Sequence, residues 1–217
     1  ISNGVDTDLF RPDLRSNKIR KSLGAGPGDF LVGYCGLHGL SQDLRVVLAA
    51  AERLKEHSRI KFALVGDGPM KQELLAIARQ KLLTHVKFLD ARPKPQIPPI
   101  LASCDVGLIP LNARMPGTMP SKTYEALAAG VPMIVGKGCE AEPLVNKYNT
   151  GRTYEPMDDK ELAEAILDLA EHPEEVKKIK SNSRELAKRF DRNVIAGQTE
   201  QILLMLAEGK KLPEVAW

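Results

Sequence analysis

The sequence is poor in cysteine and has no long apolar run. Its three cysteines, Cys35, Cys104 and Cys139, are odd in number, widely spaced and free of any Cys-x-x-Cys pair. This pattern argues against a disulfide framework and a thiolate zinc site, and it favours a reducing cytoplasm as the location. The longest apolar run, residues 126–136, is about eleven residues long, whereas a membrane-spanning helix needs about twenty. We therefore expect no membrane anchor in this chain.

An excess of one sign of charge is also absent. Lys and Arg number 31 against 28 Asp and Glu, a net charge of +3, and the two signs interleave. This balance is too even to indicate nucleic-acid binding. With 43% hydrophobic and 27% charged residues, the composition is that of an ordinary soluble globular protein. The 217 residues fit one α/β domain with a helical appendage and leave no room for a second catalytic domain.

Short apolar runs alternate with amphipathic stretches. The runs, rich in β-branched residues and flanked by Gly and Pro, predict strands at 30–35, 60–66, 86–89, 106–111, 132–135 and 151–154. The stretches predict helices at 41–55, 69–81, 96–102, 121–129 and 142–147. Because the strands are apolar on both faces and alternate with helices, we expect a Rossmann-like, six-stranded parallel sheet with helices on both faces.

The pattern changes after residue 157. Amphipathic helices are predicted at 158–171, 174–190 and 192–208 with no strand between them, so the sheet ends before this region. The only Pro-rich stretch, residues 92–99, is predicted to form a surface loop before a short helix.

Ligands of open parallel sheets bind beyond the carboxyl ends of the strands, where three turns are unusual. The first, residues 33–42, contains Gly36, His38 and Gly39. Its glycines would let backbone amides and a helix N-terminus approach a phosphate, but a merely tight turn is an equal alternative. The Gly-x-x-Gly-x-x-Gly spacing is neither that of dinucleotide-binding folds nor that of a P-loop. A lone histidine such as His38 is more often packed or solvated than functional.

The second turn contains Gly66, Asp67, Gly68 and Pro69. Pro69 suits the first position of a helix, with Gly68 as its cap. The turn would offer amides to a ligand, and Asp67 could hold a hydroxyl group. A compact strand-to-helix corner explains the same residues equally well.

The third turn, residues 117–132, is the most specific. Ser121 is predicted to be a helix N-cap, which makes Lys122 the first helical residue and places Glu125 one turn further on. A capping box would need its carboxylate at position 124, so Glu125 is free to accept hydrogen bonds from ligand hydroxyls. The alternative is a solvated glutamate favoured by the helix dipole.

The chain resembles one family over nearly its whole length. Six segments carry the resemblance, in the family's order: residues 3–6 with Phe10 and Pro12, the glycine-rich turn, 65–69, 86–89, 105–110 and 120–132. They are similar to the C-terminal, donor-binding domain of GT-B fold retaining glycosyltransferases of family four. The nearest in style are bacterial surface-polysaccharide enzymes that transfer N-acetylated hexosamines.

The resemblance implies that the N-terminal acceptor domain is absent, in keeping with a chain that opens on Ile1 without a signal-peptide pattern. Residues 1–217 would form a single nucleotide-sugar-binding domain. Within it, 1–28 would be the segment leading in from the missing domain and 158–217 a C-terminal helical segment. Leucines at 203, 204 and 206 and Trp217 would either brace the missing domain or pack on this one.

The resemblance also implies which residues bind the donor. Glu125 falls on the family's second conserved acid, which contacts the nucleotide ribose. The loop that precedes it would offer amides to the phosphate and the sugar: Thr118, Met119, Pro120 and Ser121. The second turn, from Gly66 to Pro69, and the backbone from Leu89 to Arg92 would border the base.

Two departures from the family pattern stand out. The position eight residues before Glu125, where the family has an acid that contacts the donor sugar, is Gly117. The Arg and Lys that usually neutralise the diphosphate are lacking, with Tyr34 near the first position and His38 at the second. Lys122 is our candidate for a compensating cation.

The implied reaction moves a sugar from a nucleoside diphosphate sugar, expected to be UDP-linked, to an acceptor hydroxyl with retention at the anomeric carbon. No cofactor and no metal are expected, and no catalytic residue is assigned within this chain, which alone should be inactive. The expected partners are the donor, the missing domain and an acceptor glycan or lipid-linked glycan. The full protein would be cytoplasmic, with any contact to the inner face of the membrane made through the missing domain.

Two other classes of function remain open at this point. The chain could be a nucleotide-sugar epimerase or an NAD-dependent enzyme on a related scaffold, although the glycine spacing counts against NAD. It could also be a non-catalytic nucleotide-binding module, which the loss of the first acid and of the Arg and Lys pair would fit.

Overall fold

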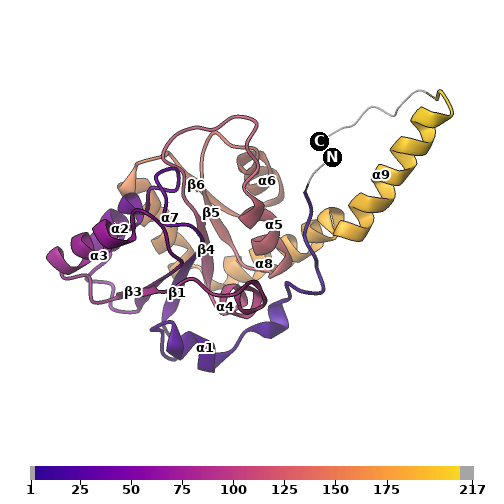
Figure 1. The fold of residues 1–217 in the computed structure, drawn as a ribbon. Coiled ribbons are helices and arrows are strands. Elements are labelled where there is room, and N and C mark those ends of the chain that lie inside the picture. Colours follow the sequence, from indigo (N-terminus) through magenta and orange to yellow (C-terminus); the bar gives the residue numbers. More distant parts are fainter. Residues whose placement is uncertain (1–2, 211–217) are drawn as a thin grey trace.

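The computed structural model describes residues 3–210 and contains the expected parallel sheet (Figure 1). Its six strands lie in the order β3-β2-β1-β4-β5-β6. They are β1 (Phe30–Cys35), β2 (Ile60–Val65), β3 (Val86–Leu89), β4 (Val106–Ile109), β5 (Met133–Gly136) and β6 (Gly151–Tyr154). All neighbouring pairs are parallel, which confirms the predicted Rossmann-like α/β fold.

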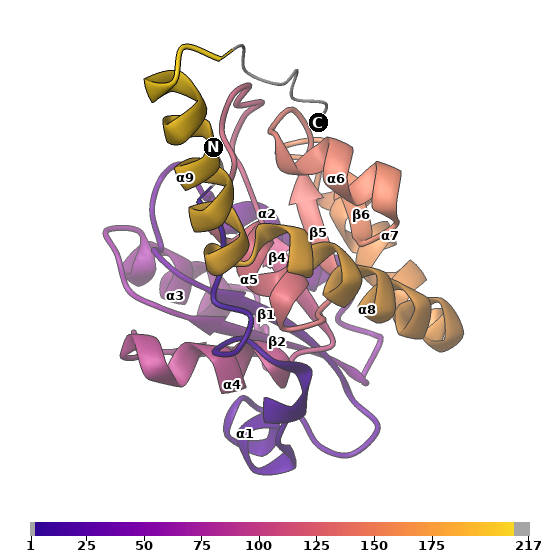
Figure 2. The ribbon, with the colours of Figure 1, turned by 90° about the vertical axis from the view of Figure 1, so that its right-hand side faces the viewer.

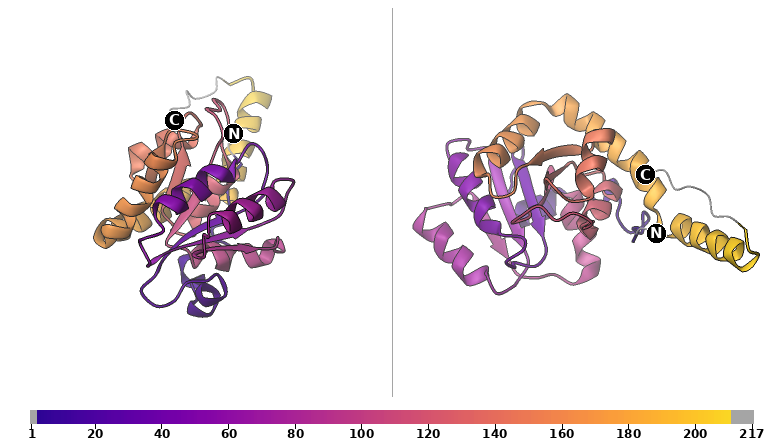
Figure 3. Two further views of the ribbon diagram at one scale, coloured as in Figure 1. Left: turned by 90° about the vertical axis from the view of Figure 1, so that its left-hand side faces the viewer. Right: turned by 90° about the horizontal axis from the view of Figure 1, so that it is seen from above.

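Helices cover both faces of the sheet (Figure 3). On one face α2 packs against α3 and α7, and on the other α5 packs against α4 and α8. The helices are α1 (Asn17–Ser22), α2 (Leu44–Arg53), α3 (Lys71–Gln80), α4 (Ile97–Ala102), α5 (Ser121–Ala128), α6 (Ala141–Tyr148), α7 (Asp159–Glu171), α8 (Pro173–Ala187) and α9 (Arg192–Ala207). Short 3-10 turns add η1 (Pro12–Leu14), η2 (Lys94–Gln96) and η3 (Lys188–Phe190).

Alternate residues of each strand enter two separate cores. Val32 and Tyr34 of β1 pack with α2 and α7, whereas Leu31 packs with the helices of the opposite face. This alternation follows from the two-residue period of a strand. It explains why the strands read as continuous apolar runs.

Several predicted helix boundaries are wrong by a few residues. The third helix begins at Lys71 rather than at Pro69, because the residues before it form a turn and Met70 takes the cap position. Ser121 is not an N-cap: it is the first residue of α5, Pro120 occupies the cap position, and no side chain caps this helix. The predicted 174–190 helix ends at Ala187, where a 3-10 turn takes over. Helix α1 was not predicted, since six residues carry too little periodicity.

The last two helices, α8 and α9, follow the end of the sheet, and α9 extends away from it. Figure 2 shows α8 crossing in front of α5, and Figures 1 and 3 show α9 projecting from the body of the domain. Leu203, Leu204 and Leu206 on α9 are exposed, whereas Trp217 lies outside the described residues. Within residues 3–210 no helix is both long and apolar enough to cross a membrane.

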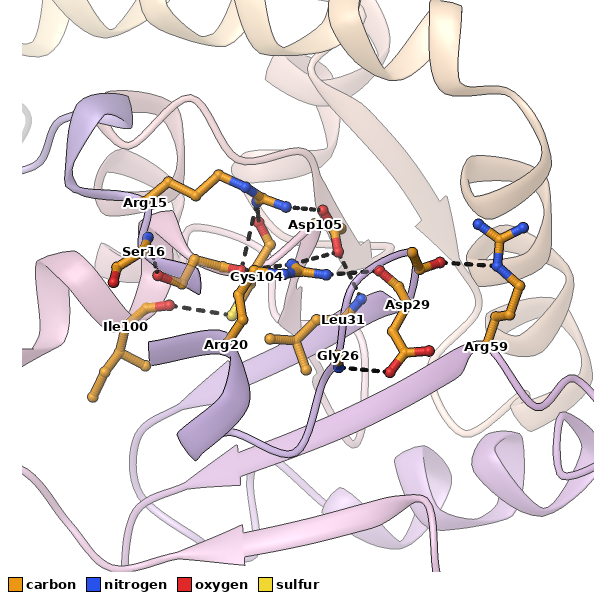
Figure 4. A network of polar contacts seen from close by, with 12 residues as sticks. Arg15, Ser16, Arg20, Gly26, Asp29, Leu31, Arg59, Ile100, Cys104 and Asp105 are labelled. Atoms are coloured by element: carbon orange, nitrogen blue, oxygen red, sulfur yellow. Dashed lines mark hydrogen bonds and ion pairs between the residues drawn. The ribbon is translucent and has the colours of Figure 1, made fainter. Parts of the chain in front are cut away.

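An ion-pair network ties the amino-terminal segment to the sheet (Figure 4). Asp105, just before β4, accepts hydrogen bonds from Arg15, from Arg20 and from the Leu31 backbone amide at 2.7, 2.8 and 2.7 Å. Arg20 also donates to the carbonyls of Ser103 and Asp29. The network lies at the amino ends of β1 and β4, so it fixes the end of the sheet opposite the predicted ligand turns.

Candidate functional site

A cavity of about 450 Å³ opens at the carboxyl ends of β1 and β2. In the order β3-β2-β1-β4-β5-β6 the chain changes direction between β1 and β4, and ligands of open α/β sheets bind at such a switch point. The lining comes from the first two turns, the loop after β3, the start of α5 and the amino-terminal segment: Phe10, Cys35, Gly36, Leu37, Val65, Gly66, Asp67, Ala91, Arg92, Lys94, Ile97, Ser121, Lys122 and Glu125.

The first two turns are held together by backbone hydrogen bonds that continue the β1–β2 pairing. The Gly36 amide donates to Val65, and the His38 amide donates to Asp67, at 2.9 and 2.8 Å. A Cβ on Gly66 would collide with the Gly36 carbonyl oxygen, and one on Gly68 would lie 2.5 Å from the His38 carbonyl oxygen. Both glycines are therefore required by the close approach of the two turns.

Of the predicted residues in these turns, Gly36, Gly66 and Asp67 line the cavity, whereas His38, Gly39, Gly68 and Pro69 do not. The His38 ring is wholly buried, with ring centroids of Tyr34 and Phe88 at 6.0 and 6.1 Å. Burial lowers the pKa of His38, and Lys71 lowers it further while Asp67 opposes the change. A neutral, buried His38 is poorly placed to neutralise a ligand phosphate, and its donor-binding role stays a prediction.

Lys71 ties the second turn to the loop after β3. Its buried ammonium donates to the Gly66 carbonyl at 3.0 Å and to the Asp90 carboxylate at 2.7 Å. Arg92 lines the cavity in this loop, whereas Leu89 does not, although the Leu89 carbonyl accepts a hydrogen bond from the Gly66 amide at 3.0 Å. The turn and the loop therefore form one rigid wall of the cavity.

The start of α5 forms the opposite wall. Ser121, Lys122 and Glu125 line the cavity, whereas Thr118, Met119 and Pro120 lie outside the lining. The Thr118 amide donates to the Met115 carbonyl at 3.1 Å, so it is not free for a ligand as predicted. The amides at the first positions of a helix lack intrahelical acceptors, and in α5 the first two belong to Ser121 and Lys122, which line the cavity.

Glu125 stands between this cavity and a second one of about 290 Å³, whose wall includes Asp6, Lys94 and Arg192. Burial raises the pKa of Glu125, and Lys122, Lys94 and Arg192 oppose that rise. Above its raised pKa, the carboxylate can accept hydrogen bonds from ligand hydroxyls.

The two cavities carry an excess of positive charge. Within residues 3–210, Arg92, Lys94, Lys122 and Arg192 form no ion pair and no side-chain hydrogen bond. These four cations outnumber the three carboxylates of the two linings, Asp6, Asp67 and Glu125, and this excess favours an anionic ligand. The same part of the chain holds no group of three or more His, Cys, Asp or Glu arranged to bind a metal ion.

Comparison with known proteins agrees with this geometry. Residues 15–186 match the family described as glycosyl transferases group 1. The chain belongs to this family. The resemblance to GT-B fold glycosyltransferases of family four, stated from the sequence motifs, is thereby confirmed.

Sugar transferases from distant organisms are similar to the chain. Sulfoquinovosyl transferase SQD2 of Arabidopsis thaliana is 25% identical over 196 residues, which are 88% of this chain and 36% of that protein. A GDP-mannose-dependent phosphatidylinositol monomannoside mannosyltransferase of Mycolicibacterium smegmatis is 28% identical over 176 residues, 78% of this chain and 46% of that protein. The chain thus spans less than half the length of these two relatives.

A solved structure is also similar to the chain over most of its length. The Anabaena protein HepE, crystallised in complex with UDP-glucose, superposes with a TM-score of 0.82 at 28% sequence identity. The superposition covers 94% of this chain and 56% of HepE. The chain therefore shares its fold with a little more than half of HepE.

Sequence reasoning did not assign several residues of the two cavity walls, among them Phe10, Lys94, Ile97 and Arg192. Phe10 was noted only as part of a motif, and Lys94 and Ile97 were absorbed into the predicted Pro-rich surface loop. Arg192 was placed only at the start of a helix. The available signal for Lys94 was its position shortly after the end of a parallel strand, where ligand loops occur. No local signal brings Arg192 to Glu125, because 67 residues separate them in the chain.

Proposed function

We propose that this chain is the donor-binding half of a retaining glycosyltransferase. The enzyme would move a sugar from a UDP-linked donor to an acceptor hydroxyl during the synthesis of a polysaccharide or glycoconjugate. The observation that carries the proposal is the cavity at the β1–β4 switch point, where Arg92, Lys94 and Lys122 line the same wall as Glu125. This arrangement suits a ligand with hydroxyl groups and a multiply charged anion.

The roles follow from the chemistry of each wall. Glu125 accepts hydrogen bonds from the ribose hydroxyls, and the loop at Ala91 and Arg92 borders the base. The first amides of α5 and the Lys122 ammonium face the diphosphate. In the transition state the leaving diphosphate gains negative charge, so fixed amides and a nearby cation stabilise it. The donor site needs no metal in this scheme.

The relatives support a nucleotide-sugar donor but differ in its base. HepE was solved with UDP-glucose, whereas the mycobacterial relative is named for GDP-mannose. Membership of the family favours a transferase over an epimerase or an NAD-dependent enzyme. Since the relatives are about twice as long or longer, an additional domain would supply the acceptor site, and this chain alone would transfer no sugar.

Calorimetric titration of the chain with UDP, GDP and NAD tests the proposal. We expect selective binding of UDP, weakened by roughly 1–3 kcal/mol in Glu125→Ala, the scale for lost hydrogen bonds to a charged group. The matched control is Glu164→Ala, which removes an exposed glutamate of α7 far from the cavity and should leave the affinity unchanged.

The other outcomes separate the alternatives. Binding of NAD in preference to both nucleoside diphosphates would overturn the proposal in favour of a dehydrogenase-like function. Absence of binding to all three ligands in a folded sample would also contradict it. UDP binding without sugar transfer by the full-length protein would identify a non-catalytic module.

A further inference from the structure

Positive charge gathers at the end of the sheet opposite the donor cavity. Arg15 and Arg20 of the amino-terminal segment share the single carboxylate of Asp105, at 2.7 and 2.8 Å (Figure 4). The Arg20 side chain is almost buried, whereas that of Arg15 is 36% exposed, so a ligand can reach it. Two guanidinium groups on one carboxylate leave this network with one net positive charge.

Helix α8 brings a third cation to the network. Lys180 of this helix is half-buried and lies within electrostatic reach of the two arginines and of Asp105. Helix α8 lies against the amino-terminal segment beside Gly130, where a Cβ would be 3.1 Å from Pro12 Cγ and 3.7 Å from the Lys180 carbonyl oxygen. Three cations therefore share one carboxylate, and the cluster carries an excess of two positive charges.

The Lys180 ammonium is poorly satisfied. Among residues 3–210 it forms no hydrogen bond and no salt bridge, and its acidic neighbour Asp105 is already shared by the two arginines. Burial lowers the pKa of Lys180, and the arginines lower it further, while Asp105 opposes the change. Because a partly buried charge is costly without a partner, an added anion would relieve an unfavourable interaction here.

Arg184, the next cation on this face of α8, fixes the helix in place. It follows Lys180 by four residues, so both side chains lie on the same face. The Arg184 Nη1 donates to the backbone carbonyls of Phe10 and Ala128 at 3.2 and 2.5 Å. These bonds hold α8 against the amino-terminal segment, so the cations keep their relative places before any ligand binds.

We propose that Arg15 and Lys180 form a binding site for an oxoanion, of the class of a phosphate monoester, between the amino-terminal segment and α8. Within residues 3–210 the Arg15 Nε makes no hydrogen bond, since the network uses Nη1 and Nη2. A guanidinium N–H and an ammonium together suit the oxygens of a phosphate, and a dianion would balance the two excess charges. Arg20 and Asp105 are positioning residues, because they act through Arg15.

Titration of the chain with inorganic phosphate tests the site. Saturating UDP keeps phosphate out of the donor cavity, and chloride holds the ionic strength constant, so screening does not contribute. We expect the Kd for phosphate to rise about tenfold in Lys180→Met, the scale for a lost hydrogen bond between charged groups. The Kd for UDP should change less than twofold, since the two sites lie at opposite ends of the sheet.

The matched control is Lys178→Met, which removes the same charge from an exposed position of the same helix. This variant should bind phosphate and UDP as the parent chain does. If the chain binds no UDP, the titrations without UDP still compare the two variants, so failure of the proposed function leaves this test intact.

Urea denaturation separates a ligand site from a structural role of the lysine. In phosphate-free buffer Lys180→Met should unfold at the same or a higher urea concentration than the parent, because the repulsion by the arginines is removed. Phosphate should raise the midpoint more in the parent and in Lys178→Met than in Lys180→Met. A lower midpoint for Lys180→Met without phosphate would show that Lys180 supports the Asp105 network, and would contradict the proposal.

The phosphate group can belong to a soluble compound or to a lipid headgroup, and sedimentation with vesicles distinguishes the two. The vesicles are phosphatidylcholine alone or phosphatidylcholine with phosphatidic acid. Phosphate binding that depends on Lys180, without vesicle binding, supports a soluble ligand. Binding to the phosphatidic acid vesicles that depends on Lys180 supports a lipid. Equal binding of phosphate and of vesicles by the parent, Lys178→Met and Lys180→Met would overturn the proposal.

Discussion

Asp105 joins the amino-terminal segment to the amino-terminal end of the sheet. Its carboxylate neutralises Arg15 and Arg20 and caps the Leu31 amide, and the side chain of Arg20 is only 7% exposed. In Asp105→Asn the two guanidinium groups would lose their counter-ion inside the protein. We expect a loss of about 3 kcal/mol in the free energy of unfolding, measured by urea denaturation, as found for broken buried ion pairs.

The same residue predicts acid sensitivity. Burial raises the pKa of Asp105, but the Leu31 amide and the two guanidinium groups together hold it below its ordinary value. The resulting stabilisation is fully present above the unfolded-state pKa of about 3.9 and is lost as the pH falls through the lower folded-state value. The stability difference between parent and Asp105→Asn should therefore shrink below about pH 4.

Asp13→Asn is the control for both measurements. Asp13 pairs with Arg11 at 3.4 Å on the surface, where both side chains are well exposed. Such pairs contribute about 0–1 kcal/mol, so this variant should unfold almost as the parent does. A loss from Asp105→Asn no larger than this would show that the network adds little.

At the scale of elements, the amino-terminal segment and α9 hold each other in place. The Val5 amide donates to Phe190 and the Val5 carbonyl accepts from Arg192, at 2.8 and 2.9 Å. Asp191 caps α9 by accepting from the Asn193 amide and also accepts from the hydroxyl of Thr7 at 2.6 Å. These contacts bring Arg192 to the wall of the second cavity.

Asp191→Ala should loosen this junction. The variant loses a helix cap and the Thr7 hydrogen bonds, a cost of about 1–2 kcal/mol for the cap. Hydrogen exchange at the amides of Val5 and Arg192 should accelerate, while the strands of the sheet keep their protection. Unchanged exchange at both amides would contradict the role given to Asp191. Asp159→Ala, at the first turn of α7, is a control that leaves this junction intact.

The turns show why boundaries were harder to predict than elements. Pro69 and Ser121 carry strong local signals for helix starts, yet α3 begins two residues later and α5 uses Ser121 inside the helix. At the first of these places the backbone is engaged elsewhere, because the Met70 amide donates to the His38 carbonyl across the turns at 3.0 Å. There a contact between segments overrides the local preference.

At the scale of the whole molecule, ligand binding and stability are coupled. A ligand that binds only the folded chain stabilises it by about 2.7 kcal/mol at a concentration of 100 Kd. For a domain of this size, UDP at that concentration should raise the Tm by roughly 5–10 °C in differential scanning calorimetry. The same UDP concentration should produce a clearly smaller shift in Glu125→Ala. Equal shifts in both proteins would place the UDP site elsewhere.

The sequence by itself determined the α/β class, the six strands, the family and most of the turns at which the cavity opens. These properties depend on local periodicity and on short motifs, so one segment suffices to reveal each. Gly66 and Glu125 were found in this way, because each belongs to a turn or helix start that is recognisable alone.

Only the tertiary structure decided which side chains share the cavity. Arg192 reaches the wall beside Glu125 because α9 is fixed against the amino-terminal segment, and His38 leaves the lining because its ring fills the core between Tyr34 and Phe88. Burial and long-range contacts depend on the packing of segments far apart in the chain. No local pattern encodes them, and they decide where charge is left free for a ligand.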